Sequence, residues 1–158
     1  RAAGIATVAV ALADHPDRRA WEDELIARLA DHRPDVVVLA GFMRLLSGTF
    51  LARWPDRVVN THPSLLPAFR GANAVGEALE YGVKVTGSTV HLVDEEVDHG
   101  PIIAQQAVEV RDDDTEASLH ERIKAVEHEL LPASVRALCR GELEVRGRHV
   151  RVREVRER

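Results

Sequence analysis

Val58-Val59-Asn60-Thr61-His62-Pro63-Ser64-Leu65-Leu66-Pro67 is the stretch that decides the fold, because an apolar run ends there in polar side chains and two prolines. The β-branched residues Val58 and Val59 suit a buried strand, whereas a proline cannot donate to a strand ladder. We therefore predict a strand that leaves the sheet near Pro63. Ligands of open parallel α/β sheets bind beyond the carboxyl ends of the strands, and residues two apart on a strand point the same way. Asn60 and His62 are predicted to project together into a crevice.

The segments around this strand alternate between strand and helix patterns. A helix is predicted from Arg18 to Asp31, and the continuous apolar run 36–41 predicts a central strand. The stretch from Ala6 to Ala11 is a further strand candidate. Later segments predict a helix over 74–81, strands over 85–93 and 101–110, a long helix after Thr115 that Pro132 either kinks or divides, and a hairpin over 143–152.

This order of elements predicts an α/β fold. Strand, helix and strand follow one another in a βαβ rhythm, which is typical of a sheet with helices on both faces. The connection between the strands over 85–93 and 101–110 is short, and a short connection favours an antiparallel pair. We expect a Rossmann-like, open, mixed but mostly parallel sheet.

Composition limits the class of protein. The chain has 158 residues, of which 45% are hydrophobic, and this size predicts a single domain spanning residues 1–158. The net charge is -5 and no apolar run approaches the length of a membrane span, so we expect no membrane partner. Cys139 is the only cysteine, which excludes an internal disulfide and favours a reducing compartment, the cytoplasm.

Two features limit the range of partners and cofactors. The arginines between Arg146 and Arg158 alternate with Glu154 and Glu157 in an acidic chain, which indicates a solvated face and no nucleic-acid partner. The eight histidines form no His-Glu-x-x-His pattern, and the acidic run 94–98 does not match an EF-hand loop. We therefore expect no metal.

Asn60, His62 and Asp98 are the candidate catalytic residues. If the acidic loop folds over the strand ends, its carboxylate comes near the imidazole and favours the imidazolium form. An imidazolium beside a carboxamide donates two hydrogen bonds to an oxyanion, which is the stabilisation that acyl transfer requires. Asp98 could then take a proton from an attacking amine, directly or through water.

Each candidate also has a plainer interpretation. His62 could only cap a strand end, and Asp98 could be a solvated loop carboxylate. Ser64 is a conceivable nucleophile, but it lacks the Gly-x-Ser-x-Gly elbow. The residues alone leave these alternatives open.

Three segments resemble the phosphoribosylglycinamide formyltransferases, folate-dependent enzymes of purine synthesis in the formyltransferase superfamily. They are Ala40-Gly41-Phe42-Met43-Arg44, the stretch 60–67, and Val97-Asp98-His99-Gly100-Pro101-Ile102-Ile103 with Gln105. The resemblance covers nearly the whole chain. It implies transfer of a formyl group from 10-formyltetrahydrofolate, as co-substrate, to the amine of glycinamide ribonucleotide.

The resemblance also implies roles for individual residues. His62 would be the general acid and oxyanion stabiliser, Asn60 its partner, and Asp98 the group that raises the histidine's pKa and relays the proton. Lys124 and Glu127 would face the ribonucleotide. The folate site would comprise Arg18, Met43, Arg44, Leu45, Leu46, Asn60, Asp94, Glu95, Glu96, Val97 and Asp98.

The sequence departs from the family pattern in two places. The family begins with a strand and a Gly-rich phosphate loop, and neither precedes Arg1. We therefore expect a formyltransferase domain without its N-terminal βαβ segment, inactive by itself. The segment 69–73 is closer to relatives that formylate initiator methionyl-tRNA or hydrolyse formyltetrahydrofolate.

The sequence is also compatible with two other functions. A formyltetrahydrofolate hydrolase would share the Asn, His and Asp, although His62-Pro63 argues against it. A non-catalytic folate- or nucleotide-binding module would bind ligand without transfer. Homodimer formation is open as well.

Overall fold

The structure is a computed structural model in which residues 3–153 are described. The chain divides into two compact units, Arg1–Asp35 and Val36–Arg158. The expectation of a single domain without an N-terminal segment stays a prediction. Residues 154–158, the end of the arginine-rich tail, lie outside the described residues.

The first unit contains the short helix η1 (Leu12–Asp14) and helix α1 (Arg18–Asp31). The carboxylate of Asp17 accepts a hydrogen bond of 2.8 Å from the N–H of Ala20 and so begins α1 at the predicted residue. The strand prediction for residues 6–11 is wrong, because these residues form no strand. An apolar run becomes a strand only beside a ladder partner, and no strand of the described sheet pairs with this segment.

The second unit is built on a six-stranded sheet in the order β1-β2-β3-β4-β6-β5. The pairs β1–β2 and β4–β6 are parallel, and the other three neighbouring pairs are antiparallel. This confirms the predicted open, mixed α/β sheet and the antiparallel β3–β4 hairpin. The strands are β1 (Val37–Leu39), β2 (Val58–His62), β3 (Val85–Leu92), β4 (Ile102–Glu109), β5 (Leu143–Arg146) and β6 (His149–Val152).

Three helices belong to this unit: α2 (Gly48–Arg53), α3 (Ala74–Tyr81) and α4 (Glu116–Cys139). The bounds of α3 and α4 agree with the sequence, whereas α2 was not predicted. Thr115 and Ser118 form a capping box that begins α4. Pro132 lies inside α4 without ending it, so the segment is one helix.

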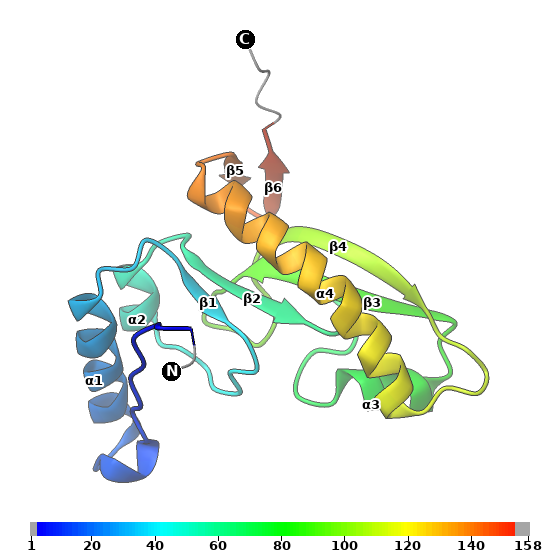
Figure 1. Cartoon of the computed structure of the whole chain (residues 1–158), viewed down its shortest axis with the longest axis horizontal. Helices are drawn as coiled ribbons and strands as arrows, with labels where there is room; N and C mark the ends of the chain where they lie inside the picture. The colour runs from blue at the N-terminus through cyan, green and yellow to red at the C-terminus, as the bar shows by residue number, and fades with distance from the viewer. Residues whose placement is uncertain (1–2, 154–158) are drawn as a thin grey trace. The chain divides into compact units, whose positions relative to one another are not determined.

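Helix α4 lies across one face of the sheet (Figure 1). Alternate residues of β2 and β3 point toward it, and Val59, Val90 and Leu92 form a core cluster with Leu138 of α4. A second cluster joins α3, β4 and α4 through Val75, Val108, Leu119 and Ile123.

The segment after β2 covers part of the opposite face. The Thr89 hydroxyl of β3 donates to the carbonyl of Ser64 at 2.7 Å and accepts from the N–H of Leu66 at 3.1 Å. The amide of Gln105 in β4 donates to the carbonyl of Leu66 at 2.9 Å. These bonds fix the chain where it leaves β2, and Asn60 and His62 lie immediately before this point.

Candidate active site

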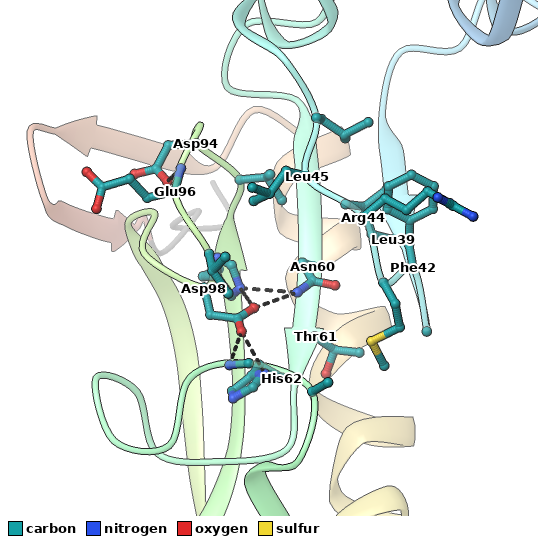
Figure 2. Close-up of a pocket in the computed structure, with 18 of the residues that line it drawn as sticks. Leu39, Phe42, Arg44, Leu45, Asn60, Thr61, His62, Asp94, Glu96 and Asp98 are labelled. Carbon is teal, nitrogen blue, oxygen red and sulfur yellow. Dashed lines mark hydrogen bonds and ion pairs between the residues drawn. The ribbon is translucent and has the colours of Figure 1, made fainter. Parts of the chain in front are cut away.

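Asn60 and His62 lie at the carboxyl end of β2, on the face opposite α4 (Figure 2). Both side chains contact the same carboxylate, that of Asp98. The residue between them, Thr61, donates instead to the carboxylate of Glu127 in α4 at 3.2 Å. The predicted two-residue spacing therefore brings the amide and the imidazole to one site.

Asp98 reaches this site from the loop between β3 and β4. Its Oδ2 atom lies 3.3 Å from Nδ1 of His62 and accepts a hydrogen bond of 2.8 Å from the N–H of Gly71. Its Oδ1 atom accepts one of 3.4 Å from Nδ2 of Asn60. The side chain is 13% exposed. The carboxylate is thus held by both predicted partners and by a backbone donor.

The pKa of Asp98 lies below its ordinary value of 3.8. Burial raises this pKa, but a hydrogen bond with His91, the Gly71 N–H and the positive charges of His62 and His91 outweigh it. Asp98 is consequently a carboxylate at neutral pH, which a proton acceptor must be.

His62 is buried, with 4% exposure. Its Nε2 atom lies 2.7 Å from the carbonyl oxygen of Phe69, and a carbonyl can only accept, so Nε2 carries a hydrogen. Its Nδ1 atom faces the Asp98 carboxylate, which also accepts. Both ring nitrogens of His62 therefore face hydrogen-bond acceptors.

His91 is a member of the site that the sequence did not reveal. It is the register partner of Asn60 across β2 and β3, and it is 2% exposed. Its Nδ1 atom lies 2.8 Å from the carbonyl of Leu92, so this nitrogen donates. Its Nε2 atom lies 3.3 Å from Nδ2 of Asn60 and 3.8 Å from Oδ1 of Asp98. A polar residue in the otherwise apolar run 90–93 was the only sequence signal for it.

A cavity of about 230 Å³ opens beside these residues (Figure 2). One wall comes from the segment after β1 and the other from the loop after β3. Its lining is Leu39, Gly41, Phe42, Met43, Arg44, Leu45, Leu46, Asn60, Thr61, His62, Pro63, Gly71, Ala72, His91, Val93, Asp94, Glu96, Val97 and Asp98.

Nine of the residues predicted for folate line this cavity, and two do not. The carboxylate of Glu95 instead lies against Gly48, where an added Cβ would be 2.8 Å from it. Arg18 begins α1 in the first unit. The role of both residues at a folate site stays a prediction.

The residues predicted for the ribonucleotide, Lys124 and Glu127, lie on α4 and do not line the cavity. Lys124 pairs with Glu121 at 2.7 Å. Glu127 accepts from Thr61, which itself lines the cavity. Their contact with a ribonucleotide stays a prediction.

The described residues contain no group of three or more His, Cys, Asp or Glu side chains placed to hold a metal ion. Within the same part of the chain, no helix is long and apolar enough to cross a membrane.

Comparisons with known proteins agree with this geometry. Residues 1–135 match the family model described as formyl transferase. The phosphoribosylglycinamide formyltransferase of Mycobacterium tuberculosis is 56% identical over 146 residues, which are 92% of this chain and 68% of that protein.

Solved structures show the same relationship. The glycinamide ribonucleotide transformylase 1 of Symbiobacterium toebii superposes with a TM-score of 0.88 at 48% identity, over 90% of this chain and 67% of that chain. A formyltetrahydrofolate deformylase of Pseudomonas syringae is more distant, with a TM-score of 0.82 at 33% identity, over 87% of this chain and 46% of that chain. This chain therefore belongs to the formyl transferase family, and within that family to the phosphoribosylglycinamide formyltransferases.

Proposed function

We propose that this chain transfers a formyl group from 10-formyltetrahydrofolate to the amine of glycinamide ribonucleotide, with Asn60, His62 and Asp98 as its catalytic residues. One observation carries the proposal: a single carboxylate contacts both the amide and the imidazole beside a cavity. The relatives named phosphoribosylglycinamide formyltransferase support the choice of substrates. The reaction belongs to purine synthesis, and the cytoplasm is the compartment that a single cysteine favours.

The reaction needs an oxyanion stabiliser and a proton acceptor. The substrate amine attacks the formyl carbon, the carbonyl oxygen becomes an oxyanion, and the bond from the formyl carbon to N10 of the folate then breaks. The product amide gains the formyl group, and N10 gains a proton in its place. Asn60 and protonated His62 donate hydrogen bonds to the oxyanion, while Asp98 accepts the amine proton and passes it on through water.

Both oxyanion donors must exchange a hydrogen bond during this cycle. Nδ2 of Asn60 lies against His91 and Asp98 in the free protein, so one of these contacts must give way to the formyl oxygen. Nε2 of His62 donates to the carbonyl of Phe69 in the free protein, and Nδ1 faces Asp98. Stabilising the formyl oxygen through Nε2 therefore requires the substrate to replace the Phe69 carbonyl as acceptor. The contact of Nδ1 with Asp98 is unchanged by this exchange.

The cavity suits the bicyclic end of a folate. Its apolar side comes from Leu39, Phe42 and Leu45, while Asp94, Glu96 and Asp98 stand on the other side (Figure 2). Backbone and acidic groups of the loop can pair with ring nitrogens of the folate, and the apolar side can pack on the ring face. No metal is required for any of these steps.

The direct test is an assay of the full-length gene product with both substrates. Loss of 10-formyltetrahydrofolate and appearance of formylglycinamide ribonucleotide should match one to one. A formyl donor that stays unchanged in the presence of the amine would contradict the proposal.

The similarity to a formyltetrahydrofolate deformylase keeps hydrolysis as the second candidate. In that reaction water replaces the amine as nucleophile, and formate is the product. Release of formate at the same rate with and without glycinamide ribonucleotide would favour the hydrolase. Binding of a folate without either reaction would favour a non-catalytic module.

A further inference from the structure

The loop that carries Asp98 is closed across its base by one carboxylate. Asp94 stands at the start of the loop and His99 follows its end. Oδ2 of Asp94 accepts a hydrogen bond of 2.6 Å from Nδ1 of His99, and Oδ1 accepts one of 3.1 Å from the N–H of Glu96. Glu96 also lies 3.9 Å from the same ring nitrogen. The hydrogen bond between Asp94 and His99 therefore closes the loop at its base, and Asp98 lies between these two residues in the chain.

Arg148, in the turn between β5 and β6, holds the closed loop against the end of the sheet through contacts with His99. Its Nη2 atom donates to the carbonyl of His99 at 2.6 Å, and its Nη1 atom lies 3.2 Å from Nε2 of His99. A guanidinium has no acceptor, so Nε2 of His99 must accept. The hydrogen then lies on Nδ1, which is the nitrogen that donates to Asp94. The tautomer of His99 with its hydrogen on Nδ1 thus satisfies both ring contacts, with Asp94 and with Arg148.

Sheet register places Arg148 at this position. β4 pairs in parallel with β6 through Ile102 and His149, so the residue before His149 falls beside the chain that returns from the loop. Gly100 is packed on the other side, because a Cβ there would be 1.8 Å from the carbonyl oxygen of Leu92. The backbone of residues 99–100 is consequently held between β3 and the β5–β6 turn.

Asp98 is the residue next to this fixed segment. Its backbone is left-handed, with φ of 46°, which non-glycine residues seldom adopt without support from their surroundings. Its contacts with His62 and Asn60 are 3.3 and 3.4 Å, near the outer limit for such bonds. The placement of the carboxylate thus depends on the loop rather than on its own partners alone.

We propose that Arg148 and His99 are positioning residues that hold Asp98 and the loop 94–98 in register with the catalytic pair and the folate. The proposal rests on the proposed function for its substrates. Neither residue touches a reacting atom. Arg148 is exposed and belongs to neither core cluster, so its loss leaves the folded core intact.

The test compares Arg148→Ala with Arg151→Ala, an exposed arginine of the same hairpin that makes no contact with the loop among the described hydrogen bonds and ion pairs. Arg148→Ala should lower kcat/KM for the formyl donor by roughly tenfold, since a displacement of about 1 Å can cost up to about a hundredfold. The KM for glycinamide ribonucleotide and the Tm should stay as in the wild type. Arg148→Lys should restore part of the loss, because an ammonium can donate to the His99 carbonyl but cannot hold both acceptors in a fork.

Hydrogen exchange of the loop gives a readout that needs no turnover. Arg148→Ala should speed exchange in peptides covering 94–100, where the Glu96 N–H is held, and in those covering 69–73, where the Gly71 N–H is held by Asp98. Arg151→Ala should leave both unchanged. Faster exchange without formyl transfer in the wild type would support the positioning role and refute the proposed function. Wild-type exchange in Arg148→Ala, or an equal loss of kcat/KM in Arg151→Ala, would overturn the positioning role.

Discussion

Asn60 and His91 face each other across the β2–β3 ladder, and Nδ2 of the amide lies 3.3 Å from Nε2 of the imidazole. This contact helps to set the orientation of the amide. The other amide hydrogen is directed to Asp98. The donor that is proposed to meet the formyl oxygen is therefore oriented by a buried neighbour that never meets the substrate.

Replacing His91 by Phe tests this orientation. The variant removes the hydrogen bonds that the buried His91 makes with the Leu92 carbonyl and the Asn60 amide. This loss should lower the free energy of unfolding by about 1–3 kcal/mol. It should also lower kcat, since the amide is no longer fixed. Urea unfolding and steady-state kinetics measure the two effects. A variant with wild-type kcat would show that Asn60 needs no help from His91.

His62→Ala should abolish transfer while leaving folate binding within a few-fold. Loss of one oxyanion donor typically costs about 2.7–4 kcal/mol, or about a hundredfold to a thousandfold in kcat. Single-turnover rates and equilibrium titration with a folate analogue separate the two quantities. His32→Ala, an exposed histidine at the end of α1, is the matched control. Near-normal turnover in His62→Ala would refute the catalytic assignment.

Asp98→Asn tests the carboxylate without changing its size. Because the pKa of Asp98 is lowered from 3.8, the wild-type group stays ionised from neutral pH down to that value. The variant should therefore lose activity by about a hundredfold or more at every pH of the neutral range. Its curve of activity against pH should keep the same shape and position. Asp112→Asn, whose carboxylate pairs only with the exposed Lys84, should behave as the wild type. A loss of activity only at low pH or only at high pH would contradict the role of Asp98 as proton acceptor.

Gly100→Ala should disturb the site without removing any polar side chain. The added Cβ would lie 1.8 Å from the carbonyl oxygen of Leu92, so the chain between Asp98 and β4 must move. Overpacking of this kind costs about 1–3 kcal/mol of stability, and the displaced Asp98 should lower kcat further. Gly76→Ala in α3, whose added Cβ would meet the side chain of Asn73 instead of backbone, serves as the control for an added methyl group. Equal Tm values and equal kcat values in both variants would show that the loop absorbs the extra atom.

Asp114→Asn should make stability less dependent on pH in acid. The hydrogen bonds from Arg122 lower the pKa of Asp114 despite its burial, so the folded state favours the ionised form. That stabilisation is fully present above the ordinary value of 3.8 and is lost as the pH falls toward the lowered pKa. Tm measured from neutral to acid pH should differ most at neutral pH and converge in acid. Asp113→Asn, its exposed neighbour, should follow the wild type throughout.

Much of this site could be predicted from local sequence. Asn60 and His62 were predicted because a strand ending in Pro63 fixes both their side and their end of the sheet. The start of α1 followed from the turn residues 14–17, of which Asp17 caps the helix. These features depend on neighbours within a few residues, which a sequence displays directly.

The missed features depend on contacts between distant residues. His91 joins the site only because β2 and β3 pair in one particular antiparallel register. The strand predicted over 6–11 failed because apolar character gives no information about a ladder partner. Helix α2 is short and begins at Gly48, so its sequence carries little helical pattern. Arg148 meets His99 only through the pairing of β4 with β6.

The alternation of side chains along β2 has a consequence for how this protein can change over evolutionary time. Asn60 and His62 point to the carboxylate of Asp98, while Thr61 points to Glu127 on the opposite helix. Substitution at any one position alters one contact. Insertion or deletion of a single residue would exchange the two faces, moving Thr61 to the side of the cavity and the two proposed catalytic groups into the helix interface. Length variation between Val58 and His62 should therefore be lethal to activity.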